Sequence, residues 1–474
     1  MIQFAKHIEK LFNSTPENIN LRPLSSTEWK GIFDHKPLQN TIEKKYGGNG
    51  IDVEKSLQLL ETASYESISL TLIFGINIAL FLEPLAKYGS DEAKDLVLSD
   101  FLEKNRTGGL MISEPQFGTD ALKMETTFTV TGDTVKIKGV KHWQGLTGQA
   151  DYWLVAGRLK ANDKLDSNVS FCLVPQKLVK CELYDTNGLK FIQYGVNHLD
   201  LEVPRAYLMN GLEANNATLG DLLNRSRMQF SGMALGHVKR MCENAENHTT
   251  ERTIRGKPLN RIQSVQNQLT KLQINYTLTQ ACRHYASKYS QLENDLSGKV
   301  LVANTIKVSV AQCMFESSNL NVQLSGGNSF LSEHPGFTGL KDSRPFSIFE
   351  GPNDMLTGQI GRVVIIGMMK AKIEDLDVYL DQLIKEEFLN TSLSLRTEVK
   401  IDMNRRGDSA YLNIIAGITM LAIKSCFLQN LKADGFDEHL IQNAEIYLTN
   451  QLIDFKAELV SGKKPYLDFI PTQR

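Results

Sequence analysis

Hydrophobic and polar residues follow a helical spacing at both ends of the chain and alternate in its middle. Through about the first hundred residues the spacing predicts several helices, with breaks at 46–50 and 88–91. Near Gly108 the pattern changes to a two-residue period, which predicts β-strands. From about Gly220 the helical spacing returns and continues to the end of the chain. The pattern therefore predicts an α+β fold with helices, a β-rich middle and helices again.

Several individual elements can be placed from this pattern. Gly132-Asp133 lies between two alternating runs, which predicts a β-hairpin. Ser90 precedes an acidic helical segment and is predicted to cap that helix. Strands are predicted at 127–131, 134–138, 152–156, 169–174 and 199–203. Small and apolar side chains predict one face of a long helix, at Met228, Ser231, Leu235, Val238, Cys242 and Ala245.

We place the domain boundaries where the spacing changes. The prediction is an N-terminal all-helical domain over 1–107, a middle β domain over 108–215 and a C-terminal helical bundle over 216–370. Residues 371–474 are predicted to form a helical extension that covers the core or builds a subunit interface.

Composition and charge are typical of a soluble globular protein. The chain is 42% hydrophobic and 22% charged, and its net charge of −2 is dispersed, so we expect no nucleic-acid partner. Six scattered cysteines without a CxxC pair favour a reducing compartment, and we expect a cytoplasmic protein. The start of the chain reads as a short amphipathic helix without a signal-peptide core. Ile68–Leu82 is uncharged but shorter than the roughly 20 residues that span a bilayer, so a buried helix is predicted rather than a membrane span.

Several common kinds of active site have no support in the sequence. No GxGxxG follows a strand and no GxxxxGK[ST] is present, which argues against a Rossmann nucleotide site or a phosphate loop. The sequence also lacks a GxSxG elbow and an HExxH pair, so neither a serine hydrolase nor a metal mechanism is expected.

Glu350 is the most informative candidate for chemistry. It lies between an apolar run that includes Phe346, Ile348 and Phe349 and the turn residues Gly351-Pro352. These apolar neighbours predict that Glu350 is withdrawn from water, which raises the pKa of a carboxyl group. Such a group can remove a proton from a weak carbon acid near neutral pH. The alternative is a solvated glutamate at the edge of a loop.

Four separated segments, in this order, resemble motifs of the acyl-CoA dehydrogenase family, and the resemblance covers roughly residues 40 to 360. The segments are MISEPQFGTD at 111–120, IKGVKHW at 137–143, ERTIRGKPL at 251–259 and, as a pair, QLSGGN at 323–328 with IFEG at 348–351. The resemblance implies a middle β-barrel or sandwich, a C-terminal four-helix bundle and a bound FAD between them. It also implies an acyl-CoA substrate, an electron-transfer flavoprotein or similar acceptor, and a homodimer or homotetramer.

The resemblance also assigns site residues. Ile112 and Ser113 would contact the edge of the isoalloxazine, and Trp143 would pack against its ring. The remaining cofactor contacts, partly from a neighbouring subunit, would come from Gly145, Arg252, Gln263, Gln323, Gly326, Gly327 and Asn353. Substrate contacts would come from Thr119, Arg227 and Gly351.

Glu350 is the catalytic base that the resemblance implies. Some family members place their base on the helix that carries residue 226, but Ser226 cannot serve in that role. Glu350 would remove the α-proton while a hydride leaves Cβ for flavin N5, which gives a trans-2-enoyl thioester. The backbone N–H of the glutamate would polarise the thioester carbonyl.

Several positions depart from the family pattern. Gly145 stands where a threonine is usual, Pro352 replaces the threonine after Glu-Gly, and Arg255 and Lys341 are also unusual. The segment at 142–148 is similar to that of acyl-CoA oxidases, so an oxidase that releases hydrogen peroxide is one alternative. A non-catalytic partner subunit of a hetero-oligomeric dehydrogenase is the other. The chain is shorter than a two-domain oxidase, which favours a dehydrogenase. The acyl length, and the choice between CoA and a carrier protein, stay open.

Overall fold

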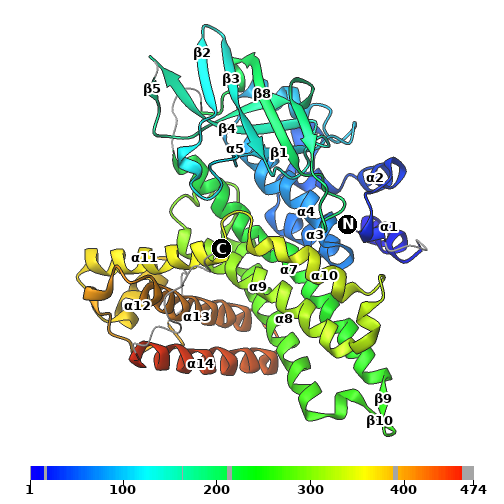
Figure 1. The fold of residues 1–474 in the computed structure, drawn as a ribbon, viewed down its shortest axis with the longest axis vertical. Coiled ribbons are helices and arrows are strands. Elements are labelled where there is room, and N and C mark those ends of the chain that lie inside the picture. Colours follow the sequence, from blue (N-terminus) through cyan, green and yellow to red (C-terminus); the bar gives the residue numbers. More distant parts are fainter. Residues whose placement is uncertain (1, 15–18, 163, 211–215, 388–392, 462–474) are drawn as a thin grey trace, which may run out of the picture. The chain divides into compact units, whose positions relative to one another are not determined.

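The computed structural model describes residues 2–14, 19–162, 164–210, 216–387 and 393–461 (Figure 1). The chain divides into two compact units, Met1–Pro352 and Asn353–Arg474. The first unit holds the predicted N-terminal helices, the β domain and a helical bundle, and the second unit is helical. This division lies before residue 371, where the extension was predicted to begin, because the helix after Pro352 packs with the C-terminal helices.

The N-terminal part of the first unit is helical, as the spacing predicts. Its helices are α1 (Ile2–Ser14), α2 (Ser26–Phe33), α3 (Val53–Glu66), α4 (Ile68–Asn77), a π-helical turn (Ile78–Leu82), α5 (Glu83–Tyr88) and α6 (Asp91–Leu98). The amphipathic α1 buries Phe4 and Ile8. The Ser90 side chain accepts a hydrogen bond from the backbone of Ala93, so the predicted cap of α6 is confirmed.

Within the described residues, two helical segments are long and apolar enough to cross a bilayer by length and composition alone, Ile68–Tyr88 and Ser409–Ala433. Within their most apolar windows 94% and 78% of the residues, respectively, are buried inside the protein. Every residue of α4 is buried, so the prediction of a buried helix over Ile68–Leu82 is confirmed. Both segments are core helices by this measure.

The middle of the chain forms an eight-stranded sheet with the strand order β1-β4-β2-β3-β8-β7, and β5 and β6 also pair with β4. The strands are β1 (Gly108–Met111), β2 (Thr127–Thr131), β3 (Thr134–His142), β4 (Tyr152–Ala161), β5 (Lys164–Leu165), β6 (Ser170–Pro175), β7 (Lys180–Leu183) and β8 (Gly195–Pro204). Thr131 pairs with Thr134 across Gly132-Asp133, so the predicted hairpin is confirmed.

A helical bundle completes the first unit. Its helices are α7 (Asn216–Glu251), α8 (Gln263–Tyr289), α9 (Val300–Ser325) and α10 (Pro335–Ser343), and a short hairpin of β9 (Thr253–Ile254) and β10 (Lys257–Pro258) joins α7 to α8. The predicted stripe on α7 faces the core, although Cys242 is only half-buried. Gly236 on α7 lets α3 approach closely, because a Cβ there would lie 1.9 Å from Glu61 O. The observed order of elements confirms the α+β fold.

The second unit contains α11 (Asn353–Ala371), α12 (Leu376–Glu387), α13 (Ser409–Ala433) and α14 (Glu438–Ser461). The apolar α13 packs against both α11 and α14. Glycines allow these close contacts, since a Cβ on Gly361 would lie 2.2 Å from Leu412 O and one on Gly417 would meet the Phe455 ring.

Candidate functional site

The segment before Glu350 is anchored by aromatic packing. Phe346 is fully buried, and its ring lies 5.4 Å from that of Phe230 on α7 and 4.9 Å from that of Phe349. Phe230 and Phe349 are 5.7 Å apart in an edge-to-face arrangement, which is favourable for aromatic pairs. Ile348, in the same apolar run, does not share this burial, because its side chain is 55% exposed. A short 3-10 turn at Arg344–Ser347 directs Phe346 inward and leaves Ile348 on the surface.

Glu350 sits in a strained turn. Its φ of 53° and the φ of 98° at Gly351 are both in the left-handed region, which costs a non-glycine residue about 1–2 kcal/mol. Buried cations hold the two carbonyls of this turn. Arg227 donates from Nε and Nη2 to Glu350 O at 3.1 and 3.0 Å, and Lys307 Nζ donates to Gly351 O at 2.8 Å. The surrounding helices therefore fix a conformation that the local sequence disfavours.

The two oxygens of the Glu350 carboxylate have different surroundings. Oε1 accepts a hydrogen bond from Ser226 Oγ at 2.8 Å, whereas Oε2 has no hydrogen-bond partner among the described residues. The residue as a whole is half-buried, but Oε2 has no access to solvent. Burial raises the pKa of Glu350 to about 7, while Ser226, Arg227 and Lys307 oppose that rise. The predicted desolvation is confirmed, and one oxygen is left free to accept a proton.

Sequence reasoning missed Lys307 on α9. Its side chain is fully buried, and burial lowers the pKa of its ammonium group to about 7, although Glu350 favours the charged form. A signal was present, because Lys307 is the only charged residue between Val300 and Phe315. A lone cation in an apolar helical run needs a partner, but the sequence does not show which one.

In the β domain, a buried ion pair holds the segment that carries Ile112 and Ser113. Lys141 Nζ donates to Glu114 Oε1 and to Ile112 O, both at 2.8 Å. The backbone N–H of His142 and the Gln144 side chain both donate to Ser113 O, at 3.1 and 3.2 Å. The structure therefore brings Ile112 and Ser113 next to the segment that carries Trp143.

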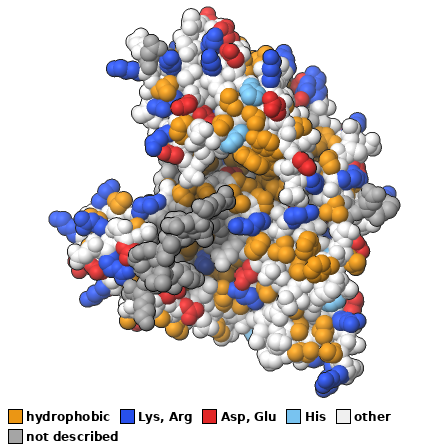
Figure 2. All heavy atoms as spheres, viewed as in Figure 1, with side chains coloured by type: hydrophobic (Ala, Val, Ile, Leu, Met, Phe, Trp, Pro, Cys, Tyr) orange, Lys and Arg blue, Asp and Glu red, His pale blue; other side chains and the backbone are white. Residues whose placement is uncertain are grey.

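Trp143 presents an open aromatic face. The side chain is 57% exposed, its φ is 61°, and its ring lies 4.7 Å from that of Tyr184. Hydrophobic side chains also gather on the surface where the β domain meets the helices (Figure 2). Close packing explains the glycine at position 145, since a Cβ there would lie 2.8 Å from Ile76 Cδ1. An exposed, rigidly held indole suits a planar ring such as an isoalloxazine.

The other predicted cofactor residues lie elsewhere. Arg252, Gln263, Gln323, Gly326 and Gly327 are exposed at the bundle end where α7, α8 and α9 share a core of Met241, Ala245, Leu272 and Leu324. The β9–β10 hairpin at this end lies away from the β domain (Figure 1). A Cβ on Gly326 or Gly327 would meet nothing within 4 Å, which leaves room for a ligand to approach the backbone. Within one chain, the predicted cofactor residues thus form two separate groups.

The predicted substrate residues also differ in their surroundings. Thr119 is exposed on a loop, and Gly351 is held by Lys307. Arg227 is only 8% exposed, and its guanidinium group donates hydrogen bonds to Glu350 O and to Asn304 Oδ1, both at 3.0 Å. Asn353, a predicted cofactor residue, belongs to neither of the two cofactor groups, because it begins α11 of the second unit.

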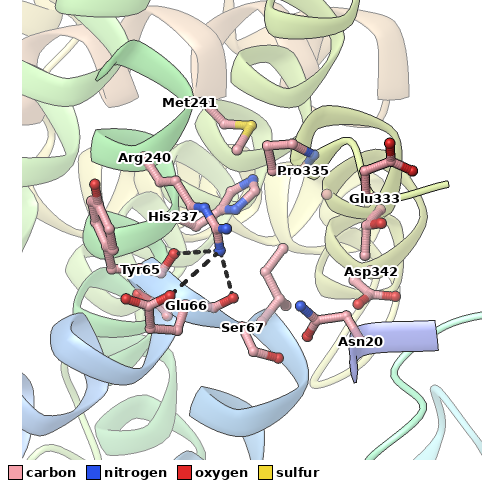
Figure 3. A pocket seen from close by; sticks show the side chains of 14 residues that line it. Asn20, Tyr65, Glu66, Ser67, His237, Arg240, Met241, Glu333, Pro335 and Asp342 are labelled. Atoms are coloured by element: carbon pink, nitrogen blue, oxygen red, sulfur yellow. Dashed lines mark hydrogen bonds and ion pairs between the residues drawn. The ribbon is translucent and has the colours of Figure 1, made fainter. Parts of the chain in front are cut away.

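A separate cavity lies between the α3–α4 junction, α7 and α10 (Figure 3). Arg240 donates there to Tyr65 O and Glu66 O, at 3.0 and 2.6 Å. His237 contacts Ser318 Oγ at 2.7 Å, and burial lowers its pKa to about 3, so the imidazole is neutral. The Arg240 and His237 side chains are therefore both used to hold helices together.

Comparisons with known proteins agree with this arrangement. Three family models match the chain: the acyl-CoA dehydrogenase N-terminal domain over residues 6–105, the middle domain over 109–199 and the C-terminal domain over 217–365. The human mitochondrial short-chain specific acyl-CoA dehydrogenase is 24% identical over 340 residues, which cover 70% of this chain and 79% of that protein.

Solved structures show the same fold. An acyl-CoA dehydrogenase from Bacillus anthracis complexed with FAD has a TM-score of 0.78 at 18% identity and covers 98% of this chain and 88% of that one. A prolyl acyl carrier protein oxidase has a TM-score of 0.69 at 17% identity and covers 76% of this chain and 98% of that one. The first of these alignments includes the second unit as well as the first. From the three matched domains, in the order that the structure shows, we conclude that the chain belongs to the acyl-CoA dehydrogenase family.

Proposed function

We propose that this protein catalyses the FAD-dependent α,β-dehydrogenation of an acyl-CoA thioester to the trans-2-enoyl thioester. The observation that carries the proposal is the Glu350 carboxylate, with Oε1 held by Ser226 and a buried Oε2 without a partner. The pKa of about 7 makes this carboxylate basic enough to take an α-proton and still largely ionised at slightly alkaline pH. Glu350 is the base in this proposal, and Oε2 is the atom that receives the proton.

The residues present fit a bound FAD. Trp143 offers an exposed ring, Ser113 lies beside it, and the Gly326-Gly327 backbone is open to an approaching group. When bound, the flavin supplies the acceptor for the hydride that leaves Cβ. The backbone N–H of Glu350 makes no hydrogen bond within the described part of the chain, so it can donate to the thioester carbonyl and stabilise developing charge there.

We further propose a homo-oligomer in which two chains complete each cofactor site. The support is the separation of the predicted cofactor residues into a group on the β domain and a group at the far end of the bundle. A second copy would bring the group that contains Arg252 and Gln323 toward the group that contains Trp143. An electron-transfer flavoprotein is the proposed electron acceptor.

The experiment that tests the proposed function is an anaerobic titration of the FAD-loaded protein with acyl-CoAs of graded chain length. Bleaching of the flavin absorbance is expected with at least one of them, and the length that bleaches fastest identifies the acyl preference. Absence of bleaching with every acyl-CoA would overturn the substrate class. Protein that stays colourless with added FAD would instead favour a non-catalytic subunit.

An oxidase is the second candidate function. The specific observation is Gly145, which lacks the side chain that most dehydrogenases of this family use near the flavin and whose Cβ position is filled by Ile76. The similarity in fold to a prolyl acyl carrier protein oxidase is compatible with this reading. Stoichiometric hydrogen peroxide with the enoyl product in air would support an oxidase. Enoyl product that requires an added electron acceptor would support a dehydrogenase.

A further inference from the structure

Lys307 is a buried cation that the proposed reaction does not use directly. It extends from α9 into the aromatic cluster beneath Glu350, and its Nζ lies 5.9 Å from the centre of the Phe230 ring. The side chain has no exposed surface, although a lysine pays several kcal/mol to leave water unless it is well partnered. Its Nζ donates a hydrogen bond at 2.8 Å to the carbonyl oxygen of Gly351, the residue that follows the proposed base.

Lys307 bonds to the strained part of the turn. Glu350 and Gly351 are consecutive residues with positive φ, so neither carbonyl belongs to a regular helix or strand. Arg227 on α7 holds the first carbonyl and Lys307 on α9 holds the second. The two helices pack against each other, so both side chains extend to the turn from well-supported helices.

The charges around Glu350 come from the same two helices. Arg227 from α7 and Lys307 from α9 are the cations that act on its carboxylate. On the neighbouring α10, Lys341 acts on Asp342 rather than on Glu350, and Asp342 accepts a hydrogen bond from the Leu189 N–H. In the segment itself, Arg344 faces the Phe315 ring at 5.9 Å. Removal of Lys307 therefore leaves Arg227 as the cation that acts on the Glu350 carboxylate.

We propose that Lys307 is a positioning residue for Glu350: it fixes the left-handed turn through Gly351 O and, in its protonated form, favours the ionised carboxylate. This inference rests on the proposed function, because it assumes that Glu350 is the base. Lys307 does not touch the substrate in this role. It acts through the geometry and the ionisation of Glu350.

The test compares Lys307→Met and Lys307→Arg with wild type in FAD-loaded protein. The first readout is an infrared titration of the Glu350 carboxyl, identified by the band that Glu350→Gln removes, and it requires no turnover. Lys307→Met should raise the titration midpoint of Glu350, because the Lys307 charge favours the ionised carboxylate and its loss raises the pKa. Lys307→Arg should keep the wild-type midpoint, since it keeps the charge.

The second readout is the rate of anaerobic flavin reduction as a function of pH. Lys307→Met should move the acid limb upward with the infrared midpoint and lower the plateau rate roughly 10- to 100-fold, as expected for a base misplaced by up to about 1 Å. Lys288→Met, which removes an exposed lysine from α8, is the matched control and should behave as wild type. A purely structural role would lower stability and FAD content without moving either midpoint.

An unchanged infrared midpoint in Lys307→Met would overturn the inference. If Lys307→Met does not fold, Lys307→Arg decides: a raised midpoint overturns the inference, and a wild-type midpoint with a reduced rate supports it. Failure of the proposed function is distinguishable, because wild type would then not bleach with any acyl-CoA. The infrared titration would still report whether Lys307 controls Glu350.

Discussion

Glu114 in the β domain and Glu350 beside the helical bundle are both withdrawn from water, and each is close to a buried lysine. The Glu114 carboxylate accepts four hydrogen bonds, from the N–H groups of Glu125 and Thr126, from Thr126 Oγ1 and from Lys141 Nζ. Burial raises the pKa of Glu114, but these partners more than offset the effect, so its pKa lies below the ordinary value. Glu350 accepts one hydrogen bond on its carboxylate, and its pKa rises to about 7.

The two sites differ in the atom to which each lysine donates its hydrogen bond. Lys141 bonds the carboxylate itself, which gives a saturated pair that holds the fold. Lys307 bonds a neighbouring carbonyl, which orients the turn and leaves the carboxylate with an unused oxygen. Burial alone therefore does not make a base. Incomplete hydrogen bonding must accompany burial, and at Glu350 both occur beside the predicted substrate residues Arg227 and Gly351, where a raised pKa can serve catalysis.

The largest expected effect is on catalysis, from Glu350→Gln. The substitution keeps the shape of the side chain and removes the proton acceptor, so flavin reduction should fall roughly 10²- to 10⁴-fold with FAD content unchanged. Stopped-flow reduction by the best acyl-CoA measures the effect. Glu83→Gln is the matched control, because Glu83 is also fully buried but lies on α5. Wild-type reduction in Glu350→Gln would remove Glu350 from its role.

Substitution in the Glu114–Lys141 pair should lower the stability of the protein rather than act on catalysis directly. Lys141→Met leaves Glu114 buried without its counter-charge, which should lower the free energy of unfolding by about 3–5 kcal/mol. FAD content should also fall, because Lys141 holds Ile112 O. Chemical denaturation measures the first effect. The double variant Glu114→Gln/Lys141→Met should recover much of the loss, and a double variant as unstable as Lys141→Met would argue against the charge as the cause.

Glu83 tests whether an incompletely bonded carboxylate limits stability at alkaline pH. Gln229 Nε2 donates to Glu83 Oε2 at 2.8 Å, whereas Glu83 Oε1 and Gln229 Oε1 have no partner among the described residues. Burial raises the pKa of Glu83 from 4.5 to about 7, so the folded state binds its proton more tightly than the unfolded state. That stabilisation is complete below about pH 4.5 and is lost as the pH rises through about 7.

Glu83→Gln should therefore stabilise the protein above pH 7, by up to about 3 kcal/mol. The new amide can also donate to Gln229 Oε1. Urea unfolding at pH 5 and pH 8 checks both points, with Glu103→Gln at an exposed position as the control. Equal stability of wild type and Glu83→Gln at pH 8 would show that Glu83 is better solvated than its surroundings indicate.

The smallest expected effect comes from Ser226→Ala. Loss of the hydrogen bond to Oε1 removes a contact that favours the ionised form, so the pKa of Glu350 should rise by about one unit. The acid limb of flavin reduction should move upward by the same amount, while the plateau changes less than about tenfold. Ser231→Ala, on the same helix with its hydroxyl bonded to Met228 O, should leave the limb in place. A limb that moves equally in both variants would indicate a general effect on α7.

Much of the fold follows from local patterns. The hairpin at Gly132-Asp133, the cap at Ser90 and the buried helix over Ile68–Leu82 all depend on residues close together in sequence, so their spacing predicts them. The desolvation of Glu350 was predictable for the same reason, since Phe346 supplies a local apolar anchor.

The rest of the site depends on contacts across the chain. Arg227 reaches Glu350 O over 123 positions and Lys307 reaches Gly351 O over 44, and no local pattern encodes either bond. The orientation of Ile348 was missed because hydrophobicity does not reveal which way a short 3-10 turn faces. The positive φ of Glu350 was also hidden, since nothing in its own residue type favours that conformation.

The pH dependence of anaerobic flavin reduction by an acyl-CoA tests the central claim most directly. If Glu350 is a base whose pKa is raised by burial and incomplete hydrogen bonding, the rate in wild type should rise about tenfold per pH unit and level off above a midpoint near 7. The residual rate of Glu350→Gln should lack this limb. A wild-type profile that is flat from pH 5 to 9, or a limb that persists in Glu350→Gln, would contradict the assignment.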